Sequence, residues 1–375
     1  MKTAVVHEWL TVWAGSENVL AEILALYPDA DLYCVVDFLP DADRARLGAR
    51  RIRTSFVQSL PLARDRYRSY LPLMPLAVEQ FDLSPYDLVI SSAHAVAKGV
   101  LTGPDQVHVS YVHSPMRYAW DLQHQYLRES GLDRGVRGWA ARWMLHRLRL
   151  WDARTANGVD RFVANSRFIA RRVRKAYGRE ADVVYPPVAV EAFTPVATKD
   201  DYYVAASRMV PYKRLDLVVA AFARRPDLRL VVAGDGPERR RLEAMATPNV
   251  RFVGHQDRAG LGALLGGARA LIFPAEEDFG ILPVEAQACG TPVIAYGRGG
   301  ALESLRGTDC DEPTALFFPE QTPEAVLTAL EDFERDPSRF TAAACRKNAE
   351  RFATERFRRE LRAVVDAALA DAGRG

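Results

Sequence analysis

The sequence predicts an α/β protein built from two doubly wound, Rossmann-like domains that face each other across a cleft. Three observations predict this fold class. Short apolar runs alternate with helical patterns along the whole chain, which is typical of parallel sheets covered by helices. The length of 375 residues exceeds that of most single domains. The stretch PPVAVEAFTP at 186–195 indicates a linker, because proline interrupts both helices and strand ladders.

The first domain is expected in residues 1–188. Its strands are expected at Thr3–His7, Leu32–Val36, Leu88–Ser91, Val107–Val112, Phe162–Asn165 and Val183–Tyr185, with helices at Ser16–Leu26, Trp139–Ala156 and Arg167–Tyr177. The second domain is expected in residues 189–354. Its strands are expected at Tyr202–Ala206, Leu228–Ala233, Val250–Val253, Ala270–Pro274, Pro292–Tyr296 and Ala315–Phe318, with helices at Leu215–Arg224, Glu238–Met245, Leu261–Gly267, Val284–Cys289 and Pro323–Glu334. A charged amphipathic helix at 355–375 is able to pack back on the first domain.

Composition narrows the class of protein. Hydrophobic residues make up 49% and charged residues 26% of the chain, as in an ordinary globular protein. The four cysteines form no CxxC pair, which favours a reducing cytoplasm over a disulfide framework or a zinc site. The first residues, MKTAVVHEWL, are too short and interrupted for a signal peptide, and no apolar run is long enough to span a bilayer. We therefore expect a cytoplasmic protein that is soluble or peripheral to the membrane.

Charge is unevenly distributed in the first half of the chain. Residues 134–179 hold 13 basic and two acidic residues, which indicates either an anionic partner or a solvated helix face. The segments 64–74 and 139–151 combine basic with aromatic and apolar residues. Each is a candidate for peripheral contact with anionic lipids; the alternative is a helix that faces the core and exposes its arginines.

The most informative segment is EEDFGILPVEAQACGTPVIA at 276–295. Here a strand ends, a helix opens at Phe279–Leu282, and a buried strand follows. The free N–H groups of such a helix start suit a phosphate, and Gly280 allows the backbone to approach it closely. Glu277 and Glu285 flank the opening and can reach hydroxyl groups. The alternative is a plain helix start with two solvated carboxylates.

Three further turns follow strands of the second domain. SRMVPYKRLD at 207–216 places Arg208 and Lys213 around a proline turn, where two cations can clamp a diphosphate. Gly234 lies in AGDGPERRRLE and Gly254–His255 end VRFVGH, where backbone groups can contact a nucleotide. The turn GRGG at 297–300 resembles a dinucleotide fingerprint, but Leu302 stands where GxGxxG needs its third glycine.

The pair Glu277-x7-Glu285 resembles the E-x7-E motif of the family 4 (GT4) retaining glycosyltransferases, which have the GT-B fold. The resemblance extends over nearly the whole chain. It implies that Glu277 contacts the hydroxyls of the donor sugar and that Glu285 binds the nucleotide ribose. The backbone N–H groups of Phe279, Gly280, Ile281 and Leu282 would hold the diphosphate, with Arg208 and Lys213 as its cationic clamp. Gly234, Gly254 and His255 would line the nucleotide.

The first domain carries two further segments of this resemblance. The loop after the first strand is Gly-rich in the family and approaches the donor diphosphate, which implies contacts from Gly15 and Ser16. Here Ala14 replaces one glycine, and Ser16 could instead be only a helix N-cap. YVHSPMRYAWD at 111–121 is similar to the H-[ST]-P-x-R-Y loop of a bacterial mannosyltransferase subset, which implies that His113 contacts the donor sugar or the reacting centre.

The resemblance implies a GDP-mannose-dependent mannosyltransferase of surface polysaccharide assembly, with catalytic roles for Glu277, His113, Arg208 and Lys213. UDP-glucose is the alternative donor, and the acceptor would be a saccharide or a polyprenyl-linked saccharide. A sugar-nucleotide epimerase or phosphorylase of the same fold is a second hypothesis. A non-enzymatic membrane- or nucleic-acid-binding protein is a third, which the donor motifs argue against. We expect no metal, because fixed cations replace it and no DxD-type acidic cluster lies in a suitable loop. We also expect no cofactor beyond the nucleotide sugar, and no nucleic-acid partner.

Overall fold

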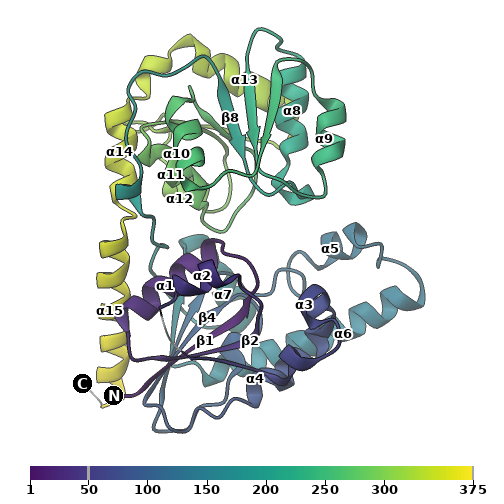
Figure 1. Cartoon of the computed structure of the whole chain (residues 1–375), viewed down its shortest axis with the longest axis vertical. Coiled ribbons are helices and arrows are strands. Elements are labelled where there is room, and N and C mark those ends of the chain that lie inside the picture. Colours follow the sequence, from purple (N-terminus) through teal and green to yellow (C-terminus); the bar gives the residue numbers. More distant parts are fainter. Residues whose placement is uncertain (49–50, 374–375) are drawn as a thin grey trace. The chain divides into compact units, whose positions relative to one another are not determined.

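The computed structural model describes residues 1–48 and 51–373 and confirms the α/β class (Figure 1). Its strands form one seven-stranded and one six-stranded sheet, and the strand pairings within the described residues are all parallel. The chain divides into two compact units. Unit 1 comprises Met1–Tyr185 and the segment from Phe357 on, and unit 2 comprises Pro186–Arg356.

The sheet of unit 1 has the order β3-β2-β1-β4-β5-β6-β7. Its strands are β1 (Thr3–Leu10), β2 (Asp31–Asp37), β3 (Ile52–Thr54), β4 (Leu88–Ala93), β5 (Val107–Val112), β6 (Arg161–Ala164) and β7 (Asp182–Val183). The six predicted strands are present. The edge strand β3 was not predicted, because none of its three residues is fully buried and they show no apolar pattern.

Helices cover both faces of this sheet because the central strands are apolar on both sides. Val5 of β1 packs in one core with α1 (Gly15–Leu26), whereas its neighbours Ala4 and Val6 pack in a second core on the other face. The second core includes α4 (Met74–Glu79) and α6 (Gly135–Thr155). The remaining helices from this part of the chain are α2 (Asp41–Ala45), α3 (Ala63–Arg66), α5 (Gln123–Glu129) and α7 (Arg167–Tyr177).

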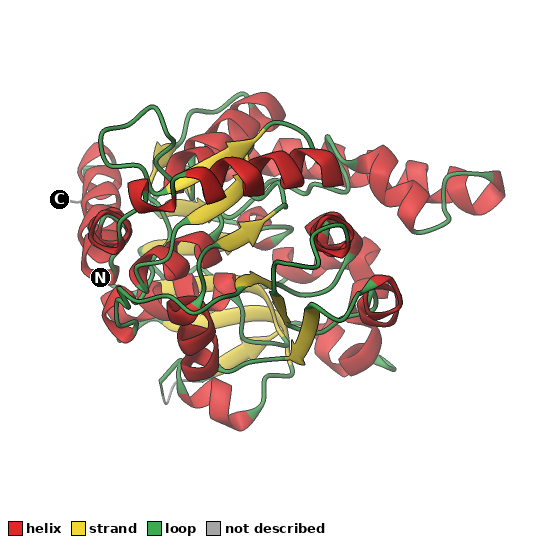
Figure 2. Ribbon diagram, turned by 90° about the horizontal axis from the view of Figure 1, so that it is seen from above, coloured by secondary structure: helices red, strands yellow, loops and turns green. Residues whose placement is uncertain are grey.

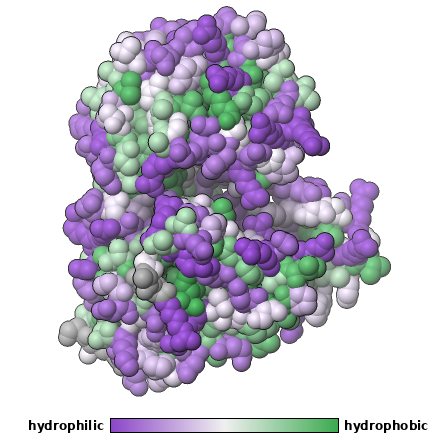
Figure 3. Space-filling view, viewed as in Figure 1, coloured by the Kyte–Doolittle hydropathy of each residue, from purple (hydrophilic) through white to green (hydrophobic). Residues whose placement is uncertain are grey.

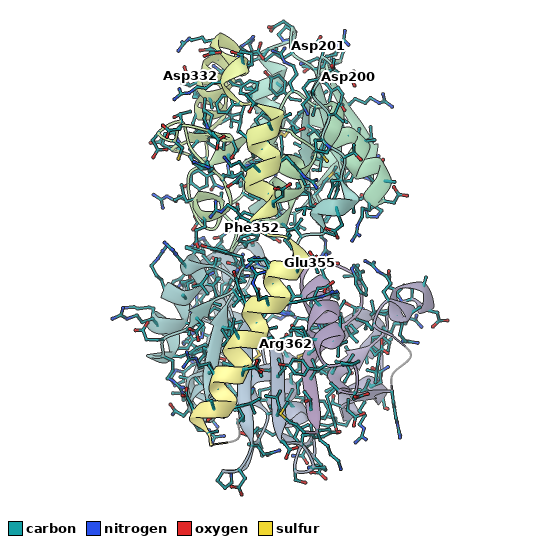
Figure 4. All side chains as sticks on the ribbon, turned by 90° about the vertical axis from the view of Figure 1, so that its left-hand side faces the viewer. Asp200, Asp201, Asp332, Phe352, Glu355 and Arg362 are labelled. Atoms are coloured by element: carbon teal, nitrogen blue, oxygen red, sulfur yellow. The ribbon has the colours of Figure 1, made fainter. Side chains whose placement is uncertain are left out.

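The last helix, α15 (Thr354–Asp371), lies across the sheet of unit 1, as Figure 4 shows with Glu355 and Arg362 labelled on it. Its apolar side chains Phe357, Leu361 and Val365 are fully buried in the same core as α1. Residues at this spacing share one helix face, so the pattern that predicted an amphipathic helix also identifies the face that packs.

The sheet of unit 2 has the order β10-β9-β8-β11-β12-β13. Its strands are β8 (Tyr203–Ala206), β9 (Leu230–Ala233), β10 (Val250–Gly254), β11 (Leu271–Phe273), β12 (Val293–Tyr296) and β13 (Ala315–Phe318). Its helices are α8 (Leu215–Ala223), α9 (Arg239–Met245), α10 (Arg258–Gly267), α11 (Ile281–Ala288), α12 (Ala301–Ser304), α13 (Pro323–Arg335) and α14 (Ala342–Glu350). Figure 2 shows strands lying between helices.

Each sheet has one point where the strand order reverses. In unit 1 the chain builds outward from β1 through β2, and then returns to the other side of β1 with β4. In unit 2 it builds from β8 through β10 and returns to the other side of β8 with β11. In open parallel sheets, ligands bind outside the carboxyl ends of the strands at this reversal. The loops after β1 and β4, and those after β8 and β11, are therefore the places where a ligand site is expected within each unit.

A buried ion pair fixes several segments of unit 1 to one another. The ammonium of Lys98 lies 2.7 Å from Asp152 Oδ1, and both side chains are almost fully buried. The other carboxylate oxygen of Asp152 accepts hydrogen bonds from Trp120 Nε1 at 2.7 Å and from the Tyr177 hydroxyl at 3.1 Å. Asp152 thus joins the segment after β5 to α6 and α7.

Candidate functional site

The reversal point of unit 2 is bridged by an ion pair between two predicted site residues. Lys213 follows β8, Glu277 follows β11, and the Lys213 ammonium is bonded to the Glu277 carboxylate. Both side chains are largely but not fully buried, with 16% and 21% of their surfaces exposed. Two residues that are distant in sequence therefore meet where the strand order predicts a ligand.

The turn before α8 places Lys213. Pro211 starts a 3₁₀ turn that ends at Lys213, and Arg214 takes a left-handed conformation with φ of 53° before the helix begins. Arg208, the other predicted cation, has an exposed side chain. Within residues 1–48 and 51–373 its guanidinium forms no side-chain hydrogen bond or ion pair. The structure thus joins Lys213, but not Arg208, to Glu277.

The loop that carries Glu277 is supported from behind by the glycines after β12. The Gly300 N–H donates to the Glu277 carbonyl at 2.8 Å. A Cβ on Gly300 would lie 2.3 Å from Phe279 Cα, and one on Gly299 would lie 2.4 Å from the Glu277 carbonyl oxygen. Neither distance is sterically possible. The GRGG turn therefore positions the Glu277 loop, a role that the sequence analysis missed although the turn follows the strand next to β11.

Helix α11 begins directly after this loop, at Ile281. Gly280 is its N-cap with a φ of 85°, and no side chain caps its N–H groups. Glu285 lies one turn further, half-buried, and has no side-chain hydrogen bond or ion pair in the described part of the chain. Burial raises the pKa of its carboxyl to about 7, although Arg258 opposes the shift. A desolvated carboxylate without a partner, near the start of a helix, is characteristic of a binding site.

The remaining predicted residues of unit 2 lie in neighbouring loops that contact one another. The Gly234 N–H donates to the Gly254 carbonyl at 2.7 Å, and a Cβ on Gly234 would lie 2.0 Å from the Ser207 carbonyl oxygen. The hydrogen bond joins the loop after β9 to the end of β10, and the close approach packs the same loop against the segment after β8. His255 follows with an exposed side chain. The loops form one continuous edge next to the pair of Lys213 and Glu277.

In unit 1, the predicted residues Gly15 and Ser16 lie in the first turn of α1. Gly15 is its first residue, and the N-cap is Ala14 rather than Ser16. The Ser16 hydroxyl donates to the Glu17 carboxylate at 3.0 Å, and the Ala14 N–H donates to the same oxygen at 2.9 Å. Glu17 thus satisfies the start of α1 in the way that a capping box does. The alternative that Ser16 serves as the N-cap is wrong.

His113 lies at the carboxyl end of β5 and is half-buried. Its Nε2 is 2.9 Å from the Ser92 hydroxyl, and its carbonyl accepts a hydrogen bond from the Asn165 amide at 3.0 Å. Burial, together with the neighbouring His94 and His7, lowers the pKa of the His113 imidazole to about 3. His113 is therefore neutral at physiological pH.

A buried acid that was not predicted from the sequence lies beside these residues. Glu8 of β1 is fully buried, and its Oε1 accepts the backbone N–H groups of His94, Ala95 and Ala97 at 2.9, 2.7 and 3.1 Å. His94 Nδ1 lies 2.8 Å from the other carboxylate oxygen. Burial alone would raise the pKa of Glu8, but His94, His7 and the Ala95 amide lower it to about 2. The available signal was the pair HE inside an otherwise apolar strand.

Two family models match the chain. Residues 190–352 match glycosyl transferases group 1, and residues 13–192 match glycosyltransferase family 4, so that together the models account for most of the sequence. Both models describe glycosyltransferases, and the chain is similar to them from residue 13 to residue 352.

The curated relatives of this chain include two that are named D-inositol 3-phosphate glycosyltransferase. The protein from Mycolicibacterium paratuberculosis is 29% identical over 228 residues, which cover 54% of this chain and 51% of that protein. The protein from Mycobacterium tuberculosis strain H37Ra is 32% identical over 180 residues, which cover 41% and 38%. The chain thus spans about half or less of the length of these relatives.

Solved structures share the fold over nearly the whole chain. Anabaena HepE in complex with UDP is 17% identical and superimposes with a TM-score of 0.72, covering 98% of this chain and 100% of that one. Sucrose-phosphate synthase from Thermosynechococcus elongatus is 19% identical with a TM-score of 0.75, covering 99% and 100%. At these identities the likeness shows the fold, and it confirms the predicted GT-B architecture.

Proposed function

We propose that this chain is a retaining hexosyltransferase that takes its sugar from a nucleotide-diphosphate donor bound by unit 2. The observation that carries the proposal is the ion pair of Lys213 with Glu277 at the strand reversal of unit 2, next to the uncapped start of α11. This place combines a cation and free N–H groups, which suit a diphosphate, with carboxylates that can accept hydrogen bonds from the hydroxyls of a sugar.

Each group has a role in that proposal. Lys213 and Arg208 neutralise the diphosphate, and the backbone N–H groups of Phe279–Leu282 bind its oxygens. Glu277 accepts hydrogen bonds from the hydroxyls of the sugar, and Glu285 accepts them from the ribose. Gly234, Gly254 and His255 contact the nucleotide, while Gly15 and Ser16 approach the diphosphate.

The transfer breaks the bond between the anomeric carbon and the phosphate oxygen and forms one to the acceptor oxygen on the same face of the sugar. The acceptor hydroxyl gives its proton to the departing phosphate oxygen, so that a glycoside and a nucleoside diphosphate are released. Positive charge from Lys213 and Arg208 stabilises the negative charge that develops on the leaving group. The proposal therefore includes no metal ion and no cofactor.

For the donor we propose GDP-mannose, on the similarity of the loop that carries His113. A UDP-sugar is the alternative, and relatives of this fold were solved with UDP and with UDP-glucose. The acceptor we propose is a saccharide or a polyprenyl-linked saccharide. A phosphorylated inositol is an alternative acceptor, supported by the names of the curated relatives. An epimerase would turn over the nucleotide sugar without any acceptor, which separates the two activities.

A thermal-shift panel of nucleotide sugars tests the donor. One of them at about 100 times its Kd should raise the melting temperature by several degrees, because ligand binding adds about 2.7 kcal/mol to stability. The shift should shrink in Lys213→Ala. Lys347→Ala is the matched control, because Lys347 is an exposed lysine of the same unit that pairs only with Glu312 among the described residues. If no nucleotide sugar at millimolar concentration stabilised the native chain, the proposal would be wrong.

Donor binding should also depend on the charge of Glu285. Its pKa of about 7 lies above the ordinary value of 4.5, so the neutral acid is the main species below pH 7 and the carboxylate is the main species above it. A carboxylate is the better acceptor for ribose hydroxyls. Affinity for a nucleotide sugar is therefore expected to fall roughly tenfold from pH 8 to pH 6. Calorimetric titration of Glu285→Gln should give a flat pH profile; an unchanged slope would contradict this role.

For α6 we propose contact with an anionic membrane surface. Val136, Trp139, Trp143 and Leu150 are more than half exposed along this helix, among arginines. Figure 3 shows hydrophobic residues interspersed with hydrophilic ones over the part of unit 1 that carries α5 and α6. In the described part of the chain, no helix combines the length and hydropathy needed to span a bilayer. Sedimentation with phosphatidylglycerol vesicles, compared between the native chain and Trp139→Ala, tests this surface.

A further inference from the structure

A chain of polar side chains crosses the carboxyl ends of three neighbouring strands in unit 1. Glu17 Oε1 lies 3.5 Å from His7 Nε2, His7 Nδ1 lies 3.2 Å from the Ser92 hydroxyl, and that hydroxyl lies 2.9 Å from His113 Nε2. Glu17, His7 and Ser92 are at most 4% exposed. The chain of groups thus runs inside the unit, from the start of α1 to His113.

The Glu17 carboxylate at one end of this series of groups decides which nitrogen of each imidazole carries its proton. Burial raises the pKa of Glu17, but its contact with His7 and its hydrogen bonds from Ser16 and the backbone lower that pKa below the ordinary value, so that Glu17 is a carboxylate. A carboxylate only accepts hydrogen bonds, so the favoured His7 tautomer carries its proton on Nε2, the nitrogen that faces Glu17. His7 Nδ1 is then an acceptor for the Ser92 O–H. The Ser92 oxygen in turn accepts from His113, which places the His113 proton on Nε2.

Two further charged groups face this chain. The centroid of the His94 ring lies 6.1 Å from that of His7 and 6.2 Å from that of His113. The carboxylate of Glu8 pairs with the His94 ring. Because Glu8 is also held by three backbone N–H groups, the two groups interact mainly with each other. Glu17 remains the carboxylate that contacts His7 directly.

We propose that Glu17, His7 and Ser92 are positioning residues that fix His113 as the neutral tautomer with its proton on Nε2. Its Nδ1 is then unprotonated and accepts a hydrogen bond from a hydroxyl of the sugar or the acceptor. The inference rests on the proposed function for the identity of that hydroxyl, but the tautomer itself does not depend on any substrate. Glu17 also accepts hydrogen bonds from Ala14 and Ser16 at the start of α1. The same carboxylate therefore positions Ser16 directly and His113 through His7 and Ser92.

The experiment compares two adjacent serines of β4. Ser92→Ala removes the link between His7 and His113. Ser91→Ala removes the same hydroxyl group from the same strand. The Ser91 hydroxyl, however, is bonded at 2.9 Å to the Nε2 of His108, which does not belong to the series of polar groups that leads to His113. Nitrogen-15 spectra of histidine-labelled full-length protein report the tautomers, with the His113 signals assigned by their loss in His113→Gln.

In the native chain, His113 should show a protonated Nε2 and an unprotonated Nδ1. Ser92→Ala should mix the two tautomers and lower kcat at least about tenfold, with the donor KM within about twofold. Ser91→Ala should leave both unchanged. If Ser92→Ala fails to fold, Glu17→Gln serves as the second variant, since its amide can donate to His7 and reverse the chain.

A native His113 protonated on Nδ1, or one whose tautomer is unaffected by either variant, overturns the proposal. A variant with a lower kcat but an unchanged His113 tautomer also overturns it, since the substitution would then act by disturbing side-chain packing. Failure of the proposed function looks different. The tautomer would respond as described, while no nucleotide sugar would shift the melting temperature of the native chain.

Discussion

The Glu277→Ala variant is expected to transfer sugar about 100- to 1,000-fold more slowly than the native enzyme. Glu277 holds the Lys213 ammonium at the strand reversal of unit 2, and we assign it the contact with the sugar hydroxyls. Its loss removes that contact and releases the lysine. Misplacing a charge-stabilising group by about 1 Å can cost about 100-fold in rate, and removing such a group costs about 100- to 1,000-fold. The measurement is the steady-state release of nucleoside diphosphate.

The neighbouring carboxylate provides the control for Glu277. Glu276 is exposed one residue earlier in the same loop, and Glu276→Ala should keep the native rate within about twofold. Both variants should melt at the temperature of the native chain to within a few degrees, because Glu277 is partly exposed. Full turnover by a folded Glu277→Ala variant would remove the basis of the proposed site.

The Lys98→Met variant is expected to lose about 3–5 kcal/mol of unfolding free energy, which is the usual cost of breaking a buried ion pair. Burial lowers the pKa of the Lys98 ammonium, and Asp152 opposes that shift. Without the lysine, the Asp152 carboxylate stays buried with only the hydrogen bonds from Trp120 and Tyr177. Urea unfolding followed by tryptophan fluorescence measures the loss.

Lys175 offers the matched substitution for this experiment. It lies on α7 of the same unit with an exposed side chain, so Lys175→Met should change the unfolding free energy by about 0.5 kcal/mol or less. A loss of less than about 1 kcal/mol in Lys98→Met would mean that water or a rearranged side chain compensates Asp152. The pair would then not be what fixes α6 to the segment after β5.

The sequence predicted the fold class and the central strands because apolar runs of four to eight residues are local patterns. It also predicted both partners of the pair between Lys213 and Glu277, each from the turn in which it lies. It could not predict that the two side chains touch, because their contact depends on β8 and β11 being neighbours. Strand order is set by the packing of the whole sheet, and the sequence of neither turn contains information about it.

The part of the site that was missed is non-local for the same reason. His7 lies on β1, Ser92 lies on β4 and His113 directly follows β5, and only the parallel pairing of these strands brings them together. The short strand β3 was missed for a different reason, since its three residues at a sheet edge, none of them fully buried, carry no periodic pattern. The role of Gly299 and Gly300 depends on the loop of a neighbouring strand, which sequence spacing does not reveal.

Helix α15 makes unit 1 discontinuous in sequence, and this determines the order in which the protein can mature during synthesis. A nascent chain that ends at Tyr185 lacks Phe357, Leu361 and Val365, and leaves the apolar surface beneath them open to water. Unit 2 is complete in sequence before this helix emerges from the ribosome. The amino-terminal unit thus reaches its final packing last, and a fragment truncated at the linker would expose an aggregation-prone surface unless the helix were supplied as a separate peptide.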